Sequence, residues 1–105
     1  MDVFEVLADP TRREVVRLLG ERPRRPAELA EVLGSSRPVM SRHLRILLQA
    51  GLVRDERTNA DARARIFRLR PESLVAVQAF LDQVQADWKV QLASFKQHID
   101  EREGT

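Results

Sequence analysis

Hydrophobic residues recur at helical spacing along most of this chain, in segments that proline, glycine and serine separate. Steps of three and four residues predict a short helix from residue 3 to about residue 8. A second helix is predicted to begin at Pro10, with Asp9 as its N-cap, and to end near Gly20. The same spacing predicts a short helix over residues 26–33, whose inward-facing side chains are Leu29, Val32 and Leu33.

The second half of the chain changes from helical spacing to alternating spacing and back. A helix with a capping serine is predicted from residue 36 to residue 50. Residues 52–58 and 63–70 predict two strands joined by a turn, and residues 71–102 predict one long helix. Four helices, a hairpin and a final helix are typical of a winged helix-turn-helix, which is mainly α with a small β-hairpin.

The composition agrees with one folded domain that spans residues 1–105. No run approaches the ~20 apolar residues of a membrane span, and charges within the first twenty positions argue against a signal peptide. We therefore expect a cytoplasmic protein that does not enter a membrane. The chain has no cysteine, no tyrosine and only 2 histidines. Disulfides and thiolate metal sites are thus excluded, and an enzyme is not expected.

Positive charge is concentrated in the first two thirds of the chain. Residues 1–70 hold 15 arginines against 10 acidic residues, whereas residues 71–105 hold three basic residues against six acidic ones. This asymmetry is expected if the first part binds a polyanion. A solvated, arginine-rich protein surface would produce the same distribution.

The helix predicted over residues 36–50 has two chemically different faces. At about 100° per residue, one face collects the mostly apolar positions Met40, His43, Leu44, Leu47 and Ala50. The opposite face collects Pro38, Ser41, Arg42, Arg45 and Gln49. Arginine donates paired hydrogen bonds to guanine in the major groove, and serine is a short donor for phosphates. This division suits a helix that reads duplex DNA, although an ordinary amphipathic surface helix has the same periodicity.

The predicted hairpin is also basic. Arg57, Arg63, Arg65 and Arg68 surround a turn that holds Asn59, where they could contact phosphates or a minor groove. A solvated hairpin is the alternative for each of these arginines.

Several stretches resemble the ArsR-type winged-helix regulators. The most specific of these runs from Ser36 to Arg45, as Ser-Arg-Pro-Val-Met-Ser-Arg-His-Leu-Arg, and is followed by Ala-Gly-Leu-Val over residues 50–53. Ala-Asp-Pro-Thr-Arg-Arg over residues 8–13 adds to the likeness, which extends from residue 1 to about residue 100.

The resemblance implies a homodimer whose recognition helices enter successive major grooves, and a repressor that occupies an operator, often in its own promoter. Carried over by motif position, the DNA-facing residues are Ser36, Arg37, Pro38, Ser41, Arg42 and Arg45. His43 belongs to the motif, but its position on the helix indicates a structural role.

Many members of that family sense metals, and this chain departs from their pattern. The family's metalloid cysteines would fall near Arg25, Ala27 and Ala30, none of which is a thiolate. A second family site uses carboxylates and histidines on the last helix, for which this chain offers only Asp87, His98 and Glu101, with Gln85 in place of a further carboxylate. The chain therefore looks like a metal-independent member, and no cofactor is predicted.

The last helix carries a hydrophobic seam of coiled-coil type. Its apolar positions recur at steps of three and four residues, which predicts a dimerisation surface. The residues predicted for this surface are Leu74, Val77, Leu81, Val84, Trp88, Leu92 and Phe95, together with Phe4 from the first helix. Trp88 lies in the middle of this seam. It is predicted either to anchor the dimer interface or to pack within its own subunit.

The sequence thus predicts a sequence-specific regulator that binds double-stranded DNA as a homodimer. Two alternatives stay open at this point: a winged helix that contacts another protein and has no operator, and a zinc- or nickel-responsive repressor that uses the last helix. The basic recognition face favours DNA over a protein partner.

Overall fold

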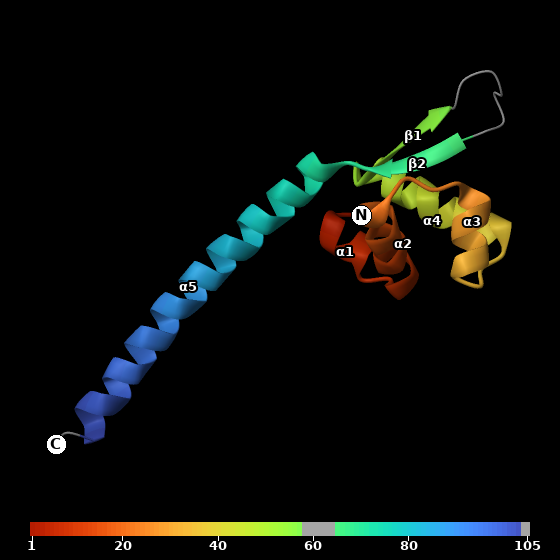
Figure 1. Ribbon diagram of the computed structural model, residues 1–105. Helices are drawn as coiled ribbons and strands as arrows, with labels where there is room; N and C mark the ends of the chain where they lie inside the picture. Colours follow the sequence, from red (N-terminus) through yellow and green to blue (C-terminus); the bar gives the residue numbers. More distant parts are fainter. Residues whose placement is uncertain (58–64, 104–105) are drawn as a thin grey trace. The chain divides into compact units, whose positions relative to one another are not determined.

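The computed structural model describes residues 1–57 and 65–103. The chain forms two units, residues 1–74 and the segment from Val75 onward (Figure 1). Asn59 and Arg63, which the sequence predicts in the basic hairpin, lie outside the described residues.

Four helices build the first unit, and side-chain caps set where three of them begin. They are α1 (Val3–Leu7), α2 (Pro10–Glu21), α3 (Pro26–Val32) and α4 (Arg37–Gln49) (Figure 1). The carboxylate of Asp9 accepts the backbone N–H groups of Thr11 and Arg12 at 2.8 and 3.1 Å, as predicted for an N-cap. Asp2 caps α1 and Ser36 caps α4 in the same way.

A two-stranded hairpin follows α4. Strands β1 (Val53–Arg57) and β2 (Arg65–Leu69) pair antiparallel, with Val53 opposite Leu69. Gly51, at φ 75°, makes the turn from α4 into β1, a conformation that glycine adopts without steric cost. The sequence did not predict that the chain at Arg24 also joins the sheet. Its N–H and C=O bond to the backbone of Phe67 at 3.2 and 2.8 Å.

The core of the first unit lies where the four helices meet the base of the hairpin. It is formed by Val6, Val15, Leu18, Leu19, Leu29, Ala30, Met40, Leu44, Leu47, Leu52, Val53 and Phe67. The inward face predicted for the helix that starts at residue 26 is wrong at one position. Val32 is 56% exposed, because the buried face of α3 extends from Leu29 toward Ala30, and Val32 lies on the other side of Leu29.

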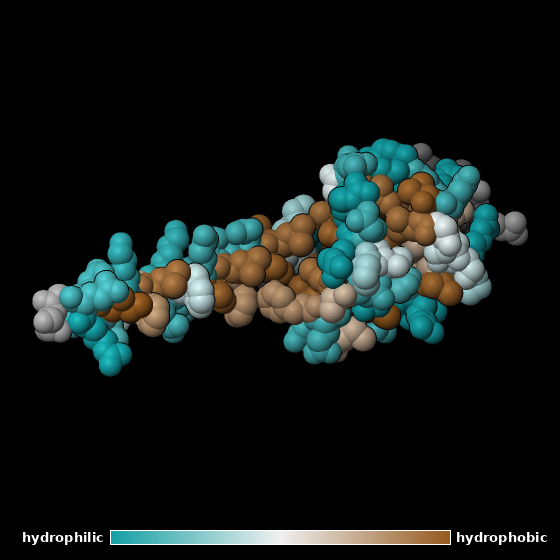
Figure 2. Space-filling model, turned by 90° about the horizontal axis from the view of Figure 1, so that it is seen from below, coloured by the Kyte–Doolittle hydropathy of each residue, from teal (hydrophilic) through white to brown (hydrophobic). Residues whose placement is uncertain are grey.

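Helix α5 (Pro71–Glu103) is the last element, and most of it belongs to the second unit. It has no buried residue along its 33 positions. Figure 2 shows apolar side chains running along this helix beside hydrophilic ones. None of the helices within residues 1–57 and 65–103 combines the length and the hydrophobicity that a membrane span requires.

Candidate nucleic-acid interface

Helix α4 is held by one face and presents the other to solvent. Met40, Leu44 and Leu47 are almost completely buried, as their spacing predicts. All six residues of the predicted DNA-facing set are exposed, namely Ser36, Arg37, Pro38, Ser41, Arg42 and Arg45. The packing against α2, α3 and β1 therefore fixes which side of α4 can meet a ligand as large as DNA.

A buried arginine ties α4 to the start of the chain. Arg12, 9% exposed, donates from Nε to the carbonyl oxygen of Val6 at 2.7 Å. Its Nη1 lies 3.4 Å from Nδ1 of His43 on α4 and 3.7 Å from a carboxylate oxygen of Asp9. One guanidinium thus connects α1, the N-cap of α2 and the recognition helix, which explains why His43 points to the core edge.

Asp9 takes part in the same network as an ionised group. Burial alone would raise the pKa of Asp9. The hydrogen bond from the backbone N–H of Arg12 and the positive charge of its guanidinium lower this pKa by more than burial raises it. The net result is a pKa below the ordinary value for an aspartate, so the N-cap is charged near neutral pH.

Unlike most other arginines of this unit, the arginines on α4 have no carboxylate partner among the residues that the structure describes. Within residues 1–57 and 65–103, no ion pair involves Arg37, Arg42 or Arg45. On α2, by contrast, Arg17 pairs with Glu14 at 2.8 Å and with Glu21 at 3.3 Å. Three cations without a bound counter-charge on one short helix make a positively charged surface that suits a polyanion.

The two serines of the set have different local roles. The hydroxyl of Ser36 accepts the N–H of Val39 at 3.3 Å and so caps α4. Ser41 lies one turn further along the exposed face. Pro38 stands in the first turn of α4, where its missing N–H costs no hydrogen bond. In the first turn of α4, the Val39 N–H is therefore bonded within the chain and Pro38 has none, so side chains are the main hydrogen-bond donors there.

The described part of the hairpin brings two predicted residues to the same edge of the molecule. Arg57 and Arg65 pair across the strands and are both exposed. Arg65 is partly neutralised, because its Nη2 lies 2.6 Å from Asp55, and its guanidinium lies 5.3 Å from the centre of the Phe67 ring. No ion pair involves Arg57 among the residues that the structure describes.

Sequence reasoning missed the two arginines that hold the site together. Arg24 is 9% exposed and donates to the carbonyl of Leu18 at 3.2 Å, to Glu28 at 2.9 Å and to Glu21 at 2.8 Å. It joins α2, α3 and the hairpin base, as Arg12 joins α1, α2 and α4. The only sequence signal was that Arg24 stands two residues before the proline that begins α3.

The residues predicted for dimerisation differ in how far they are buried within the chain. Leu74 packs against the core of the first unit, and Val77 is half-buried. The others are exposed, with exposed fractions from 46% to 63%: Phe4, Leu81, Val84, Trp88, Leu92 and Phe95. The row from Leu81 to Phe95 along α5 is an exposed apolar surface of the kind that marks interaction sites.

Of the three metal candidates, Asp87 lies apart from His98 and Glu101. Asp87 and His98 are separated by about 16 Å along α5 at 1.5 Å per residue, too far to share an ion within one chain. Asp87 accepts a hydrogen bond from Gln83 at 3.0 Å, and Glu101 accepts one from Gln97 at 3.3 Å. Among residues 1–57 and 65–103, no three potential ligands are gathered around one point.

A solvent-facing basic helix, set on a helical core and flanked by a hairpin, defines a winged helix-turn-helix protein. Residues 7–56 match the helix-turn-helix domain family. The HTH-type transcriptional regulator Rv2034 of Mycobacterium tuberculosis is 37% identical over 97 residues, 92% of this chain and 85% of that protein. The transcriptional repressor SdpR of Bacillus subtilis is 39% identical over 56 residues, 53% of this chain and 62% of that protein.

Solved structures agree with these relatives. The ArsR-like transcriptional regulator from Rhodococcus sp. RHA1 has a TM-score of 0.76 at 32% identity, covering 90% of this chain and 87% of that one. The chain belongs to the ArsR-type family of winged helix-turn-helix transcriptional regulators. It is therefore a DNA-binding regulator and not an enzyme, and the fold class predicted from the sequence is confirmed.

Proposed function

We propose that the chain is a repressor that binds an operator in double-stranded DNA as a homodimer, with the exposed face of α4 in the major groove. The observation that carries this proposal is the set of three exposed arginines on α4 that have no carboxylate partner among the described residues. Among the described residues, none of the three has an ion pair that must break before it approaches DNA. Arg42 and Arg45 are the candidates for guanine contacts, and Ser36, Arg37, Pro38 and Ser41 for close approach to the backbone.

In this proposal the wing adds contacts beside the major groove. Arg57 and Arg65 would bind phosphates, and Asn59 and Arg63 keep the same role predicted from their sequence positions. Arg65 would contribute less than Arg57, because Asp55 already neutralises part of its charge.

The proposed homodimer accounts for the exposed apolar residues of α5. About 50 Å of helix carries large side chains in water, and a second copy that presents the same seam would cover them. Residues 71–102 would then serve as the dimerisation helix of a single winged-helix domain that spans residues 1–105. Repression is supported by the likeness to SdpR, whose name describes a transcriptional repressor.

Selection of bound fragments from the genome of the source organism tests this proposal. The purified protein should retain a small set of fragments that share an inverted repeat, with half-sites about one helical turn apart. A reporter placed behind such a fragment should be silenced when the protein is expressed. Retention of all fragments alike, or a reporter that is activated, would contradict the proposed repressor.

A further inference from the structure

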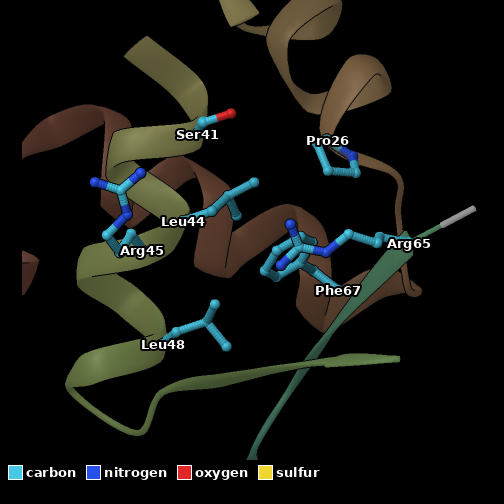
Figure 3. Close-up of a pocket in the computed structure, with 7 residues that line it drawn as sticks. All are labelled: Pro26, Ser41, Leu44, Arg45, Leu48, Arg65 and Phe67. Atoms are coloured by element: carbon cyan, nitrogen blue, oxygen red, sulfur yellow. The ribbon is translucent and has the colours of Figure 1, made fainter. Parts of the chain in front are cut away.

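A pocket opens between α4, the start of α3 and strand β2. It has a volume of about 310 Å³, at the lower end of the range for small-molecule sites. Figure 3 shows the side chains that line it: Pro26, Ser41, Leu44, Arg45, Leu48, Arg65 and Phe67. All of them belong to the first unit, and three of them, Ser41, Arg45 and Arg65, are predicted DNA-facing residues.

The lining of this pocket divides into an apolar part and a cationic part. Half-buried Leu48 supplies most of the accessible hydrocarbon surface, because Leu44 and Phe67 are each only 2% exposed. Arg45, Arg65 and the hydroxyl of Ser41 supply hydrogen-bond donors. No carboxylate is among the described side chains that line the pocket. The combination suits a ligand with one anionic end and one apolar end. A bare inorganic anion would leave the exposed part of Leu48 in contact with water. A neutral hydrocarbon would remove water from the guanidinium groups without giving them a hydrogen-bond acceptor.

Arg65 is already held in the position that a ligand needs. In Figure 3 its side chain extends across the Phe67 ring toward α4. The Nε and Nη2 groups of Arg65 donate to a carboxylate oxygen of Asp55 at 3.2 and 2.6 Å, so Nη1 can donate to another acceptor. Arg45 has no ion pair in the described ranges. A carboxylate therefore meets one guanidinium, that of Arg65, which its neighbours already hold in place, so little ordering of Arg65 is required on binding. Arg45 is exposed and would turn toward the ligand when it binds.

We propose that this pocket binds a small organic anion in which a carboxylate is joined to a ring or a short hydrocarbon chain, and that this anion competes with DNA. The carboxylate pairs with Arg45 and Arg65, and the apolar end covers the exposed part of Leu48. A ligand seated there occupies Ser41 and Arg45 on the face that DNA needs. The competition rests on the proposed function, whereas binding of the anion to the free protein does not.

Titration of the free, full-length protein with benzoate, followed by backbone amide NMR shifts, tests the site. Shifts are expected to cluster at residues around the pocket, such as Ser41, Leu48 and Phe67. Benzoate should bind at least about ten-fold more tightly than benzamide, which lacks the charge, and than acetate, which lacks the ring. Inorganic phosphate binding as tightly as benzoate would show a plain phosphate site, such as one for the DNA backbone, and would overturn the proposal.

Two variants separate the cationic part of the pocket from the apolar part. Arg65→Gln should weaken benzoate binding about ten-fold, whereas Arg57→Gln, which removes an exposed strand arginine outside the pocket, should leave benzoate affinity unchanged. Leu48→Phe should fill the apolar part and also abolish binding, with folding checked by thermal unfolding. Equal benzoate affinity in Arg65→Gln and wild type would refute the site.

Competition is measured last, on a DNA fragment that the protein retains. Benzoate should weaken DNA binding, whereas acetate at equal ionic strength should not, a necessary control because DNA affinity falls with salt. Leu48→Phe should bind DNA normally and resist benzoate. If benzoate binds the pocket but leaves DNA affinity unchanged, the competition is wrong. If no fragment binds, the proposed function fails, and the benzoate titration still decides the site.

Discussion

Replacing Arg12 by methionine is expected to destabilise the protein more than the loss of any surface arginine. Methionine keeps much of the hydrocarbon stem but donates no hydrogen bond. The carbonyl of Val6, whose residue is fully buried, would lose the guanidinium that donates to it at 2.7 Å. An unsatisfied buried acceptor costs about 1–3 kcal/mol, and a hydrogen bond from a charged group contributes about 1.5–3 kcal/mol.

We therefore expect Arg12→Met to lower the free energy of unfolding by about 3 kcal/mol. A domain of this size has roughly 5–15 kcal/mol in total, so a substantial fraction would be lost. The melting temperature should fall by roughly 12–24 °C, at 4–8 °C per kcal/mol. The assay is urea and thermal unfolding by circular dichroism, at one fixed protein concentration because dimerisation would contribute to stability.

Arg13→Met is the matched control for this prediction. Arg13 also donates to two carbonyls, those of Leu7 and Ala8 at 2.9 and 3.1 Å, but it is exposed. Water can replace the lost donor there, so the change should cost less than about 1 kcal/mol. The reasoning is refuted if the two variants unfold at the same urea concentration.

Three further predictions concern the dimer, the N-cap and the backbone. Trp88→Ala should lower dimer stability and DNA affinity together; weaker DNA binding with an intact dimer by sedimentation would contradict the proposed seam. The folded pKa of Asp9 is lowered, so its contribution is full above the unfolded value of 3.8 and is lost as pH falls through the folded pKa. Asp9→Ala should therefore cost about 1 kcal/mol at pH 7 and progressively less below about pH 4, which unfolding curves across pH would check. Gly51→Ala should lower the free energy of unfolding by about 1–2 kcal/mol, because φ at this position is 75°. Gly20→Ala, in α2 with open space around its Cα, should raise it by roughly 0.5–1 kcal/mol. Equal melting temperatures for the two variants would contradict this.

Periodicity predicted the elements well because each helix of the first unit has one buried face. The burial of Met40, Leu44 and Leu47 follows from their spacing alone, and so does the exposure of Arg42 and Arg45. Short helices are less well determined. Two turns of α3 leave the inward face poorly defined, and the prediction for Val32 was wrong for that reason.

Pairings between distant parts of the chain could not be predicted from spacing. Whether an arginine is buried with Val6 and His43, like Arg12, or exposed, like Arg13, depends on how α1 and α4 pack around α2. The pairing of Arg65 with Asp55 depends in the same way on strand register. From the sequence, Arg57 and Arg65 have the same predicted role. In the structure Arg65 pairs with Asp55, whereas Arg57 has no ion pair among the described residues.

The central claim is that the exposed face of α4 reads duplex DNA, and one comparison tests it most directly. Binding of a selected operator is measured against salt for wild type, Arg42→Ala, Arg45→Ala and Arg17→Ala by fluorescence anisotropy. Arg17, paired with two glutamates on α2, is the control and should leave affinity unchanged.

Arg42→Ala should weaken operator binding by about 1–3 kcal/mol per half-site and relax the preference at one base position in each. If Arg42 instead binds a phosphate, all sequences should weaken alike and the salt slope should fall by about 0.9 for each phosphate that is no longer neutralised. Either result agrees with α4 touching DNA. Equal affinity and equal salt slope in Arg42→Ala, Arg45→Ala and wild type would contradict it.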